Sequence, residues 1–422
     1  MKLFHISLTL LLTTISTFCW AQVWTLDECL RHSLANNRQI KLQRLESDRL
    51  HTQVRAGYLD MLPALSFTFS DSFGWKKAFS GDNNPTFDFT GSLTLFHGLS
   101  AHWKCRTAED AYEISRLEES GMEEDLTIET IEAYLQLGQS YQQLEYARSG
   151  YESSLRESER TNLLVESGLQ PLSARYQIES QLSADRAAVV EAESAIKSRT
   201  LELCQLMDVP YSENFVIDLY GPESDTLAAP STCPSGFVEK VALRNPKYIG
   251  CLTAIRQNRN LHKQSIAMLS PEISFVAGYS ASLGPSSHRL GDSFGISISL
   301  PICGAWQHLA KVQEAKIGIR KAETEAGRVR REIESLLEKI TIETENCYGK
   351  ALAARDALKA SEELMRTSEL KYSRGLMTAT DYLLSRNELD KARSTFLKEK
   401  WQYLFRSRII EYYMTRYCDE QG

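Results

Sequence analysis

The feature that most constrains what this chain can fold into is an internal duplication. The run Leu62-Pro63-Ala64-Leu65-Ser66-Phe67 recurs 208 residues later as Ser270-Pro271-Glu272-Ile273-Ser274-Phe275. Three further pairs keep nearly the same spacing: Asn37 with Asn245, His102 with His308, and Ser167-Gly168-Leu169 with Arg374-Gly375-Leu376. Because four pairs at nearly constant spacing are hard to obtain by chance, the sequence predicts two copies of one structural unit of about 200 residues.

The duplication divides the chain into segments. We predict a signal peptide over residues 1–21, a first repeat over 22–208, a linker over 209–235 rich in Pro, Ser and Asp, and a second repeat over 236–422. Each repeat has the same expected order: a helical stretch (25–60 and 236–269), two strands joined by a Gly/Ser/Asp-rich turn, a very long helix, a Gly-Leu break and a last helix. The linker carries one short strand candidate, Phe215-Val216-Ile217.

The predicted strands alternate apolar and polar side chains, which is typical of a sheet with two different faces. The apolar positions are Leu65, Phe67 and Phe69; Phe87, Phe89, Leu93 and Leu95; Ile273, Phe275, Ala277 and Tyr279; and Phe294, Ile296, Ile298 and Leu300. Each run is close to the roughly 9–11 residues of a tilted transmembrane strand, although a half-buried hairpin of a soluble protein fits any single run equally well. The predicted export signal, combined with two such hairpins, favours transmembrane strands over a hairpin of a soluble protein. The candidates for lipid contact are Leu65, Phe67, Phe87, Phe89, Ile273, Phe275, Ile296 and Ile298.

The predicted long helices are unusual for their length. No Pro interrupts residues 99–168 or 305–375, and about 70 helical residues span on the order of 100 Å. In the second repeat, apolar residues recur at alternating steps of three and four, which predicts a coiled-coil seam. These residues are Val312, Ala315, Ile319, Ala322, Ala326, Val329, Ile333, Leu336 and Ile340. The first repeat keeps the spacing less cleanly, at Leu137, Tyr141, Leu144, Tyr151 and Leu155, with Arg148 interrupting it.

Four strands per chain are too few to close a membrane barrel. Open sheet edges are not tolerated in hydrocarbon, and the smallest closed barrels have about eight strands. A barrel must therefore be shared between chains: two chains supply eight strands, too few for an open lumen, and three supply twelve. The expected fold class is mainly α with a small β part, in which a ring of coiled-coil helices continues an oligomeric barrel as a conduit.

The first residues are typical of an export signal. Lys2 precedes an apolar core from Leu8 to Phe18, and Cys19-Trp20-Ala21 places small residues before a cleavage point at Gln22. The alternative is a lipoprotein with Cys19 acylated. Eight of the nine Cys follow the signal peptide, without any CxxC, so we expect mostly buried free thiols, with Cys418 the exposed one.

Composition excludes several other classes. The net charge of −7 comes with no basic tract, which argues against nucleic-acid binding. No segment after the signal peptide approaches the ~20 consecutive apolar residues of a transmembrane helix. The eight His show no zinc-ligand spacing such as HExxH, and neither GxSxG nor a P-loop occurs. We therefore expect no enzyme activity, no metal site and no cofactor.

The ordered set of motifs resembles the TolC family of outer-membrane efflux channels. The resemblance rests on Trp24-Thr25-Leu26-Asp27-Glu28-Cys29-Leu30, on the duplicated Pro-x-[Leu/Ile]-Ser-Phe strand starts, and on the strand exits Leu93-Thr94-Leu95-Phe96-His97-Gly98 and Ile298-Ser299-Leu300-Pro301-Ile302-Cys303-Gly304. It also rests on Tyr372-Ser373-Arg374-Gly375-Leu376 followed by Thr380-Asp381-Tyr382-Leu383. It covers essentially the whole mature chain.

The resemblance implies a homotrimer with a 12-stranded outer-membrane barrel and a long helical barrel in the periplasm. It implies two kinds of partner besides outer-membrane lipid: a periplasmic adaptor (membrane fusion protein) and an inner-membrane transporter of the RND or ABC type. The implied function is the exit duct of a tripartite efflux or type I secretion system. The alternative is a periplasmic coiled-coil scaffold or adaptor without a pore. Such a protein would be extracted by buffer without detergent.

The resemblance also places a periplasmic gate near the Gly168 and Gly375 turns. Tyr372 lies at the position of the gating tyrosine and Asp381 at the first of two inward acids, but Leu384 replaces the second acid. Met377 and Ala174 replace an arginine and its aspartate partner. We hypothesise that Met377 and Leu384 hold this gate by apolar contacts. The alternative is that Asp381 only complements a helix dipole and that Tyr372 is ordinary packing.

Overall fold

The computed structural model describes residues 23–72, 84–212, 215–218, 227–230, 234, 236–284, 287–300 and 305–418. The predicted signal peptide, with Cys19, lies outside these residues, as do Cys233 and Cys303. The chain forms two compact units, one of residues 1–38, 123–237 and 336–422 and the other of residues 39–122 and 238–335. We refer to them as unit 1 and unit 2. Each unit takes segments from both halves of the chain, because the two longest helices run through both units.

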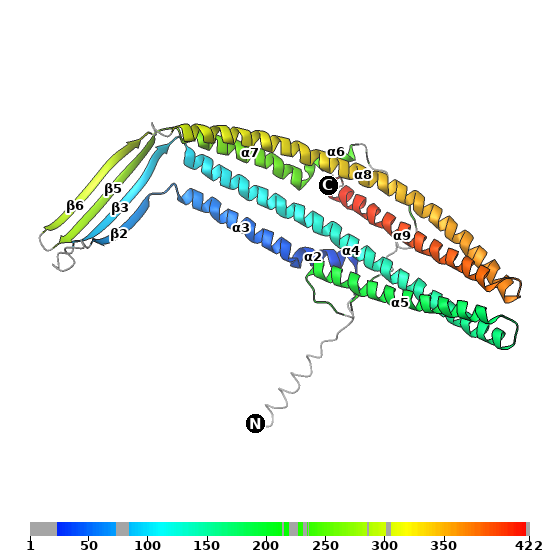
Figure 1. Cartoon of the computed structure of the whole chain (residues 1–422). Helices are drawn as coiled ribbons and strands as arrows, with labels where there is room; N and C mark the ends of the chain where they lie inside the picture. Colours follow the sequence, from blue (N-terminus) through cyan, green and yellow to red (C-terminus); the bar gives the residue numbers. More distant parts are fainter. Residues whose placement is uncertain are drawn as a thin grey trace, which may run out of the picture. The chain divides into compact units, whose positions relative to one another are not determined.

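The two halves of the chain carry the same succession of long elements (Figure 1). The first half contains β1 (Val23–Trp24), α2 (Leu26–Asn36), α3 (Arg38–Leu59), β2 (Ala64–Ser72), β3 (Asn84–His97), α4 (Ser100–Glu166) and α5 (Leu172–Met207). The second half contains β4 (Val216–Ile217), α6 (Phe237–Arg244), α7 (Pro246–Ala267), β5 (Glu272–Gly284), β6 (Ser287–Ser299), α8 (Ala305–Ser373) and α9 (Ala379–Tyr417). The predicted long helices, hairpins and short linker strand are all confirmed.

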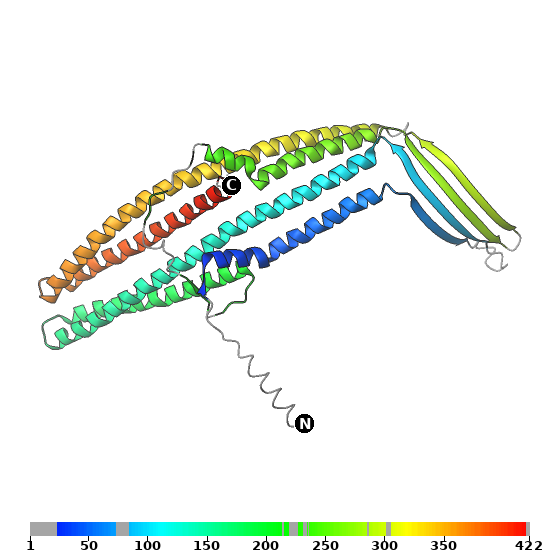
Figure 2. The ribbon, with the colours of Figure 1, turned by 180° about the vertical axis from the view of Figure 1, so that it is seen from behind.

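Unit 2 contains a four-stranded antiparallel sheet in the order β2-β3-β5-β6, which Figure 2 shows from behind. The two hairpins meet at β3 and β5, so the sheet joins the two sequence repeats. The register shifts between Thr94 and Phe96, where a bulge brings Phe96 opposite Ile273. The simple alternation that predicted Leu95 on the same face as Leu93 therefore fails at this point, because a bulge inserts one unpaired residue into the strand.

Polar contacts connect the helices of unit 2. Gln43 of α3 donates from Nε2 to the Ser115 carbonyl oxygen of α4 at 3.1 Å. Asp110 of α4 is 5% exposed and accepts from Arg256 Nε at 2.6 Å and from Asn260 Nδ2 at 2.7 Å, both on α7. Since the buried carboxylate has a cationic and a neutral donor, its burial is compensated. These contacts place α4 between α3 and α7.

Unit 1 has its apolar core where α2 meets α4 and α5. Thr25 and Glu28 form a capping box that begins α2. The core residues are Cys29, Ala133, Tyr134, Leu137, Leu203, Cys204, Met207, Phe215 and Ile217. Phe215 and Ile217 come from the linker, and the parallel pairing of β4 with β1 brings them there. The free thiols Cys29 and Cys204 are buried as predicted, whereas Cys418 is only half-buried.

The apolar seam of α8 departs from its predicted course at one point. Ala326 and Ile333 are buried as expected, but Leu336 is 49% exposed and Leu337 is 2% exposed. The buried stripe continues from Leu337 through Cys347, Ala351, Ala354 and Leu358. The step from Ile333 to Leu337 is four residues where three were expected, which shifts the seam around the helix. The boundary between the two compact units falls at the same place, at Leu336.

Candidate functional site

The sheet of unit 2 has one apolar face and one polar face. Side chains of directly paired residues in an antiparallel sheet lie on the same face, and they alternate along each strand. The register therefore collects one set of residues on the apolar face: Leu65, Phe67, Phe69, Phe87, Phe89, Leu93, Ile273, Phe275, Ala277, Tyr279, Ala281, Leu290, Phe294, Ile296 and Ile298. All eight candidates for lipid contact belong to this set. The other face carries mainly Ser, Thr and Gly.

Among the described residues, large side chains of the apolar face are exposed to solvent. Leu65 is 75% exposed, Phe294 is 84% exposed and Ile298 is 70% exposed. Aromatic rings also meet across the strands, with the Phe69 and Phe87 centroids 5.0 Å apart. A contiguous apolar surface of this kind marks contact with another apolar phase or with a partner. Asp71 and Asp292 are the acidic side chains on this face.

The second candidate region is the pair of turns that join the long helices in unit 1. Gly168 and Gly375 adopt positive φ angles of 75° and 70°. In each turn the next residue donates its backbone N–H five residues back, from Leu169 to Leu164 and from Leu376 to Lys371, both at 2.9 Å. The glycine N–H bonds three residues back in both turns, which completes a Schellman motif in each repeat. Gly is required here because its backbone adopts this conformation without the strain that a Cβ imposes.

Tyr372 is packed inside its own turn region. It is 2% exposed, its ring stacks on Tyr382 at 4.6 Å, and its hydroxyl oxygen accepts from Gln170 Nε2 at 3.3 Å. Arg160 lies over the ring and donates to the Ser373 carbonyl oxygen at 3.0 Å. These bonds join the turn of the first repeat to the turn of the second.

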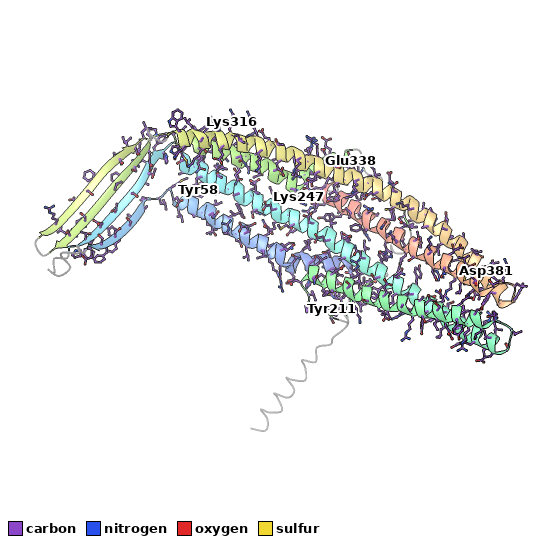
Figure 3. All side chains as sticks on the ribbon, viewed as in Figure 1. Tyr58, Tyr211, Lys247, Lys316, Glu338 and Asp381 are labelled. Atoms are coloured by element: carbon purple, nitrogen blue, oxygen red, sulfur yellow. The ribbon has the colours of Figure 1, made fainter. Side chains whose placement is uncertain are left out.

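The other predicted gate residues lie on or just before α9. Asp381, which Figure 3 labels, is in the first turn of α9, and Thr378 caps the start of this helix by accepting from the Asp381 N–H at 3.1 Å. A carboxylate at this position complements the helix dipole. Leu384 is 60% exposed, Met377 is half-buried and Ala174 is buried. Leu384 is therefore available for contacts outside its own chain.

A buried ionic cluster that sequence reasoning missed lies farther along the same helices. Arg386 of α9 is 4% exposed and donates to Asp185 Oδ2 of α5 at 2.7 Å. It also donates to Ser154 Oγ and to the Gly150 carbonyl oxygen of α4, each at 2.6 Å. Ser154 in turn donates to Asp185. We call Arg386, Asp185, Ser154 and Gly150 the three-helix clamp, because they connect α4, α5 and α9.

The sequence contained a signal for this clamp. Asp185 lies seven residues after the buried Ile178 and seven before the buried Ala192, so it occupies a seam position of α5. Arg386 lies four residues after the buried Tyr382 and three residues before the buried Leu389, which also places it on the buried stripe of its helix, α9. A charge at a buried seam position needs a partner, and opposite charges at two such positions would have predicted the pair.

The described part of the chain shows neither a metal cluster nor a membrane-spanning helix. No three His, Cys, Asp or Glu side chains there gather in a way that suits a metal ion. Among the same residues, no helix has both the length and the apolar composition to cross a membrane.

Comparisons with known proteins relate this geometry to a family. Residues 29–208 match the family described as outer membrane efflux protein. A search of curated proteins finds no match. Among solved structures, CusC superposes with a TM-score of 0.80 at 15% identity, covering 92% of this chain and 91% of its own. Campylobacter jejuni CmeC superposes with a TM-score of 0.79 at 15% identity, covering 94% of this chain and 87% of its own. The open state of Neisseria gonorrhoeae MtrE superposes with a TM-score of 0.75 at 17% identity, covering 92% of this chain and 88% of its own.

These solved structures are of one type of protein. CmeC and MtrE are described as outer-membrane channels, and the CusC structures concern transmembrane channel formation. At these identities the structural matches establish the fold, and the sequence match over residues 29–208 establishes the family of the first repeat. Residues 29–208 therefore belong to the family described as outer membrane efflux protein, and the chain as a whole shares its fold with the outer-membrane channels CmeC and MtrE.

Proposed function

We propose that this protein is the outer-membrane exit duct of a tripartite efflux or type I secretion system. It passes substrates from an inner-membrane transporter of the RND or ABC type, through a periplasmic adaptor, to the exterior. Three copies form a 12-stranded barrel, and their long helices form a barrel in the periplasm. It carries out transport rather than catalysis, in keeping with a family of efflux proteins.

The observation that carries this proposal is the four-stranded sheet. It exposes a continuous apolar face, including Leu65, Phe294 and Ile298, and a polar opposite face. In a barrel wall the apolar face contacts lipid and the polar face lines the lumen. Four strands do not close a barrel, so the wall needs further copies of the chain.

The proposed gate lies at the two helix turns. Leu384 is 60% exposed and Met377 is half-buried just before α9, so both side chains are candidates for apolar contacts between copies. Asp381 supplies at most one acidic ring. Tyr372 supports the gate indirectly, because its packing with Tyr382 holds each turn together.

The alternative from the sequence, a periplasmic scaffold without a pore, is disfavoured by the exposed sheet face. A soluble scaffold would leave these apolar side chains in water, where each Leu, Ile or Phe side chain lacks the stabilisation of about 1.5–3 kcal/mol that full burial contributes.

The test is native mass spectrometry of the protein extracted from outer membranes in mild detergent. We expect three copies per particle and no extraction by detergent-free buffer. A single copy, or release into buffer, would contradict the shared barrel and favour the scaffold. Conductance of the purified particle in planar bilayers then distinguishes a pore from a closed assembly.

A further inference from the structure

The two outer strands of the sheet define how neighbouring copies must join. β2 and β6 are the first and last strands in the sheet order, so each has one edge that no strand among the described residues covers. In a bilayer the backbone groups of such an edge need partners. This inference rests on the proposed function, and the partner is a second copy of this chain. β6 runs antiparallel to β2 in the sheet order, so β6 of one copy can extend antiparallel to β2 of the next.

The internal duplication supplies the register of this pairing. Phe67 of β2 lies opposite Phe89 of β3, and the equivalent Phe275 of β5 lies opposite Ile296 of β6. Positions in β2 therefore correspond to β5 with an offset of 208, and positions in β3 correspond to β6 with an offset of 207.

The junction between the repeats is already present inside the chain. β3 pairs with β5 so that Thr90 is opposite Gly278, Gly91 is opposite Ala277 and Ser92 is opposite Val276. In a closed ring, the next junction joins the second-repeat hairpin of one copy to the first-repeat hairpin of the following copy. If all junctions in the ring are equivalent, the β6·β2 junction between copies has the same register as the β3·β5 junction inside each chain.

We propose that β6 pairs with β2 of the neighbouring copy with Ser297 opposite Ser70, Ile298 opposite Phe69, Ser299 opposite Thr68 and Leu300 opposite Phe67. These positions follow by applying the two offsets to the β3·β5 junction.

The chemistry of the faces agrees with this register. Ile298 and Phe69 both lie on the apolar face, and Ser297 and Ser70 both lie on the polar face. A slip of one residue would place apolar side chains of one copy beside polar side chains of the next. A slip of two residues keeps the faces matched, so face chemistry alone leaves alternatives that the internal junction resolves.

Disulfide cross-linking tests the register with a matched control. The in-register variant carries Ser70→Cys and Ser297→Cys, and the control carries Ser66→Cys and Ser297→Cys. Both make the same chemical change on the same polar face, but Ser66 is four residues, or about 13 Å, from Ser70 along the strand. Within one chain β2 and β6 are three strand spacings apart, about 14 Å, which is beyond disulfide reach. Any bond between them therefore joins two copies.

We expect oxidation to convert the in-register variant into covalent dimers and trimers on a denaturing gel, at least tenfold faster than the control. Ser299→Cys with Thr68→Cys is a second in-register pair for the case that the first fails to fold. Single-cysteine variants measure any background from native thiols.

The outcomes separate the two proposals. Faster linking of the control, or no linking by either in-register pair in a particle of three copies, overturns the register and leaves the exit-duct proposal standing. A particle of one copy in native mass spectrometry overturns the exit duct, and the strand pairing with it.

Discussion

Arg386 and Asp185 form a buried ion pair between α9 and α5, with Nη2 and Oδ2 2.7 Å apart. The Arg386 side chain is 4% exposed and the Asp185 side chain is 14% exposed. Because Arg386 also donates to Ser154 and Gly150 of α4, one side chain joins the last helix of the second repeat to both long helices of the first. The clamp therefore supplies a polar connection within the chain, set back along the helices from the Gly168 and Gly375 turns.

Removing the cation should loosen α9. Arg386→Met leaves the largely buried Asp185 carboxylate without its cationic partner, and we expect a loss of about 3–5 kcal/mol in the free energy of unfolding. The measurement is a denaturation curve in detergent followed by circular dichroism, together with hydrogen exchange of α9. Arg366→Met is the control, since Arg366 and Glu363 are 72% and 70% exposed and their pair should contribute about 0–1 kcal/mol. Equal effects of the two changes would refute the importance of the clamp.

Alanine should have opposite effects at a turn glycine and at a helix glycine. Gly375→Ala forces a Cβ into a left-handed conformation at a cost of about 1–2 kcal/mol. Gly349→Ala, in the middle of α8, should stabilise the protein by about 0.5–1 kcal/mol, because alanine loses less conformational freedom in a helix. A Cβ meets nothing within 4 Å at either site, so the backbone conformation is the difference. Melting temperatures that shift in the same direction would contradict this account.

Gly138 should be needed for the packing of Trp401. A Cβ at residue 138 would lie 2.6 Å from the Trp401 ring, whose Nε1 donates to Gln142 at 3.0 Å. Gly138→Ala should therefore destabilise unit 1 by about 1–3 kcal/mol through overpacking. The same change in a Trp401→Ala background should cost much less, and a double-mutant cycle of unfolding free energies measures the difference. An unchanged cost would show that the ring is not the obstacle.

Glu157 should make stability depend on pH. Burial raises the pKa of this carboxyl above its ordinary value of 4.5, opposed by Arg160, Thr161 and Tyr372 and reinforced by Glu369. Since the folded state binds the proton more tightly than the unfolded state, stability should rise as pH falls from neutral through the folded pKa toward 4.5. Glu157→Gln should reduce this slope, as measured by melting temperatures between pH 7 and pH 4.5. Glu159→Gln, at an exposed position of the same helix, is the control for replacing a carboxylate by an amide.

The exposed Leu384 should restrict the proposed gate. Leu384→Ser removes an apolar contact between copies, so we expect the purified channel to conduct more in planar bilayers. Leu364→Ser, at an exposed position of α8 away from the turn, should leave conductance unchanged. An unaltered conductance of Leu384→Ser would end the apolar-gate hypothesis.

The sequence by itself determined the features that depend on neighbours along the chain. The offset between Phe67 and Phe275 revealed the duplication, the alternation around Phe89 and Ile296 revealed the sheet faces, and Gly168 and Gly375 marked the turns. These features follow from strand and helix periodicity and from the conformational freedom of glycine, all of which are local properties.

The tertiary structure decided which residues meet across elements. It buries Leu337 where the helical pattern favoured Leu336, and the bulge brings Phe96, rather than Leu95, opposite Ile273. It also pairs Arg386 with Asp185, which are 201 residues apart in the chain. Such contacts depend on the register between elements brought together by folding, and that register depends on packing against a partner element rather than on local periodicity.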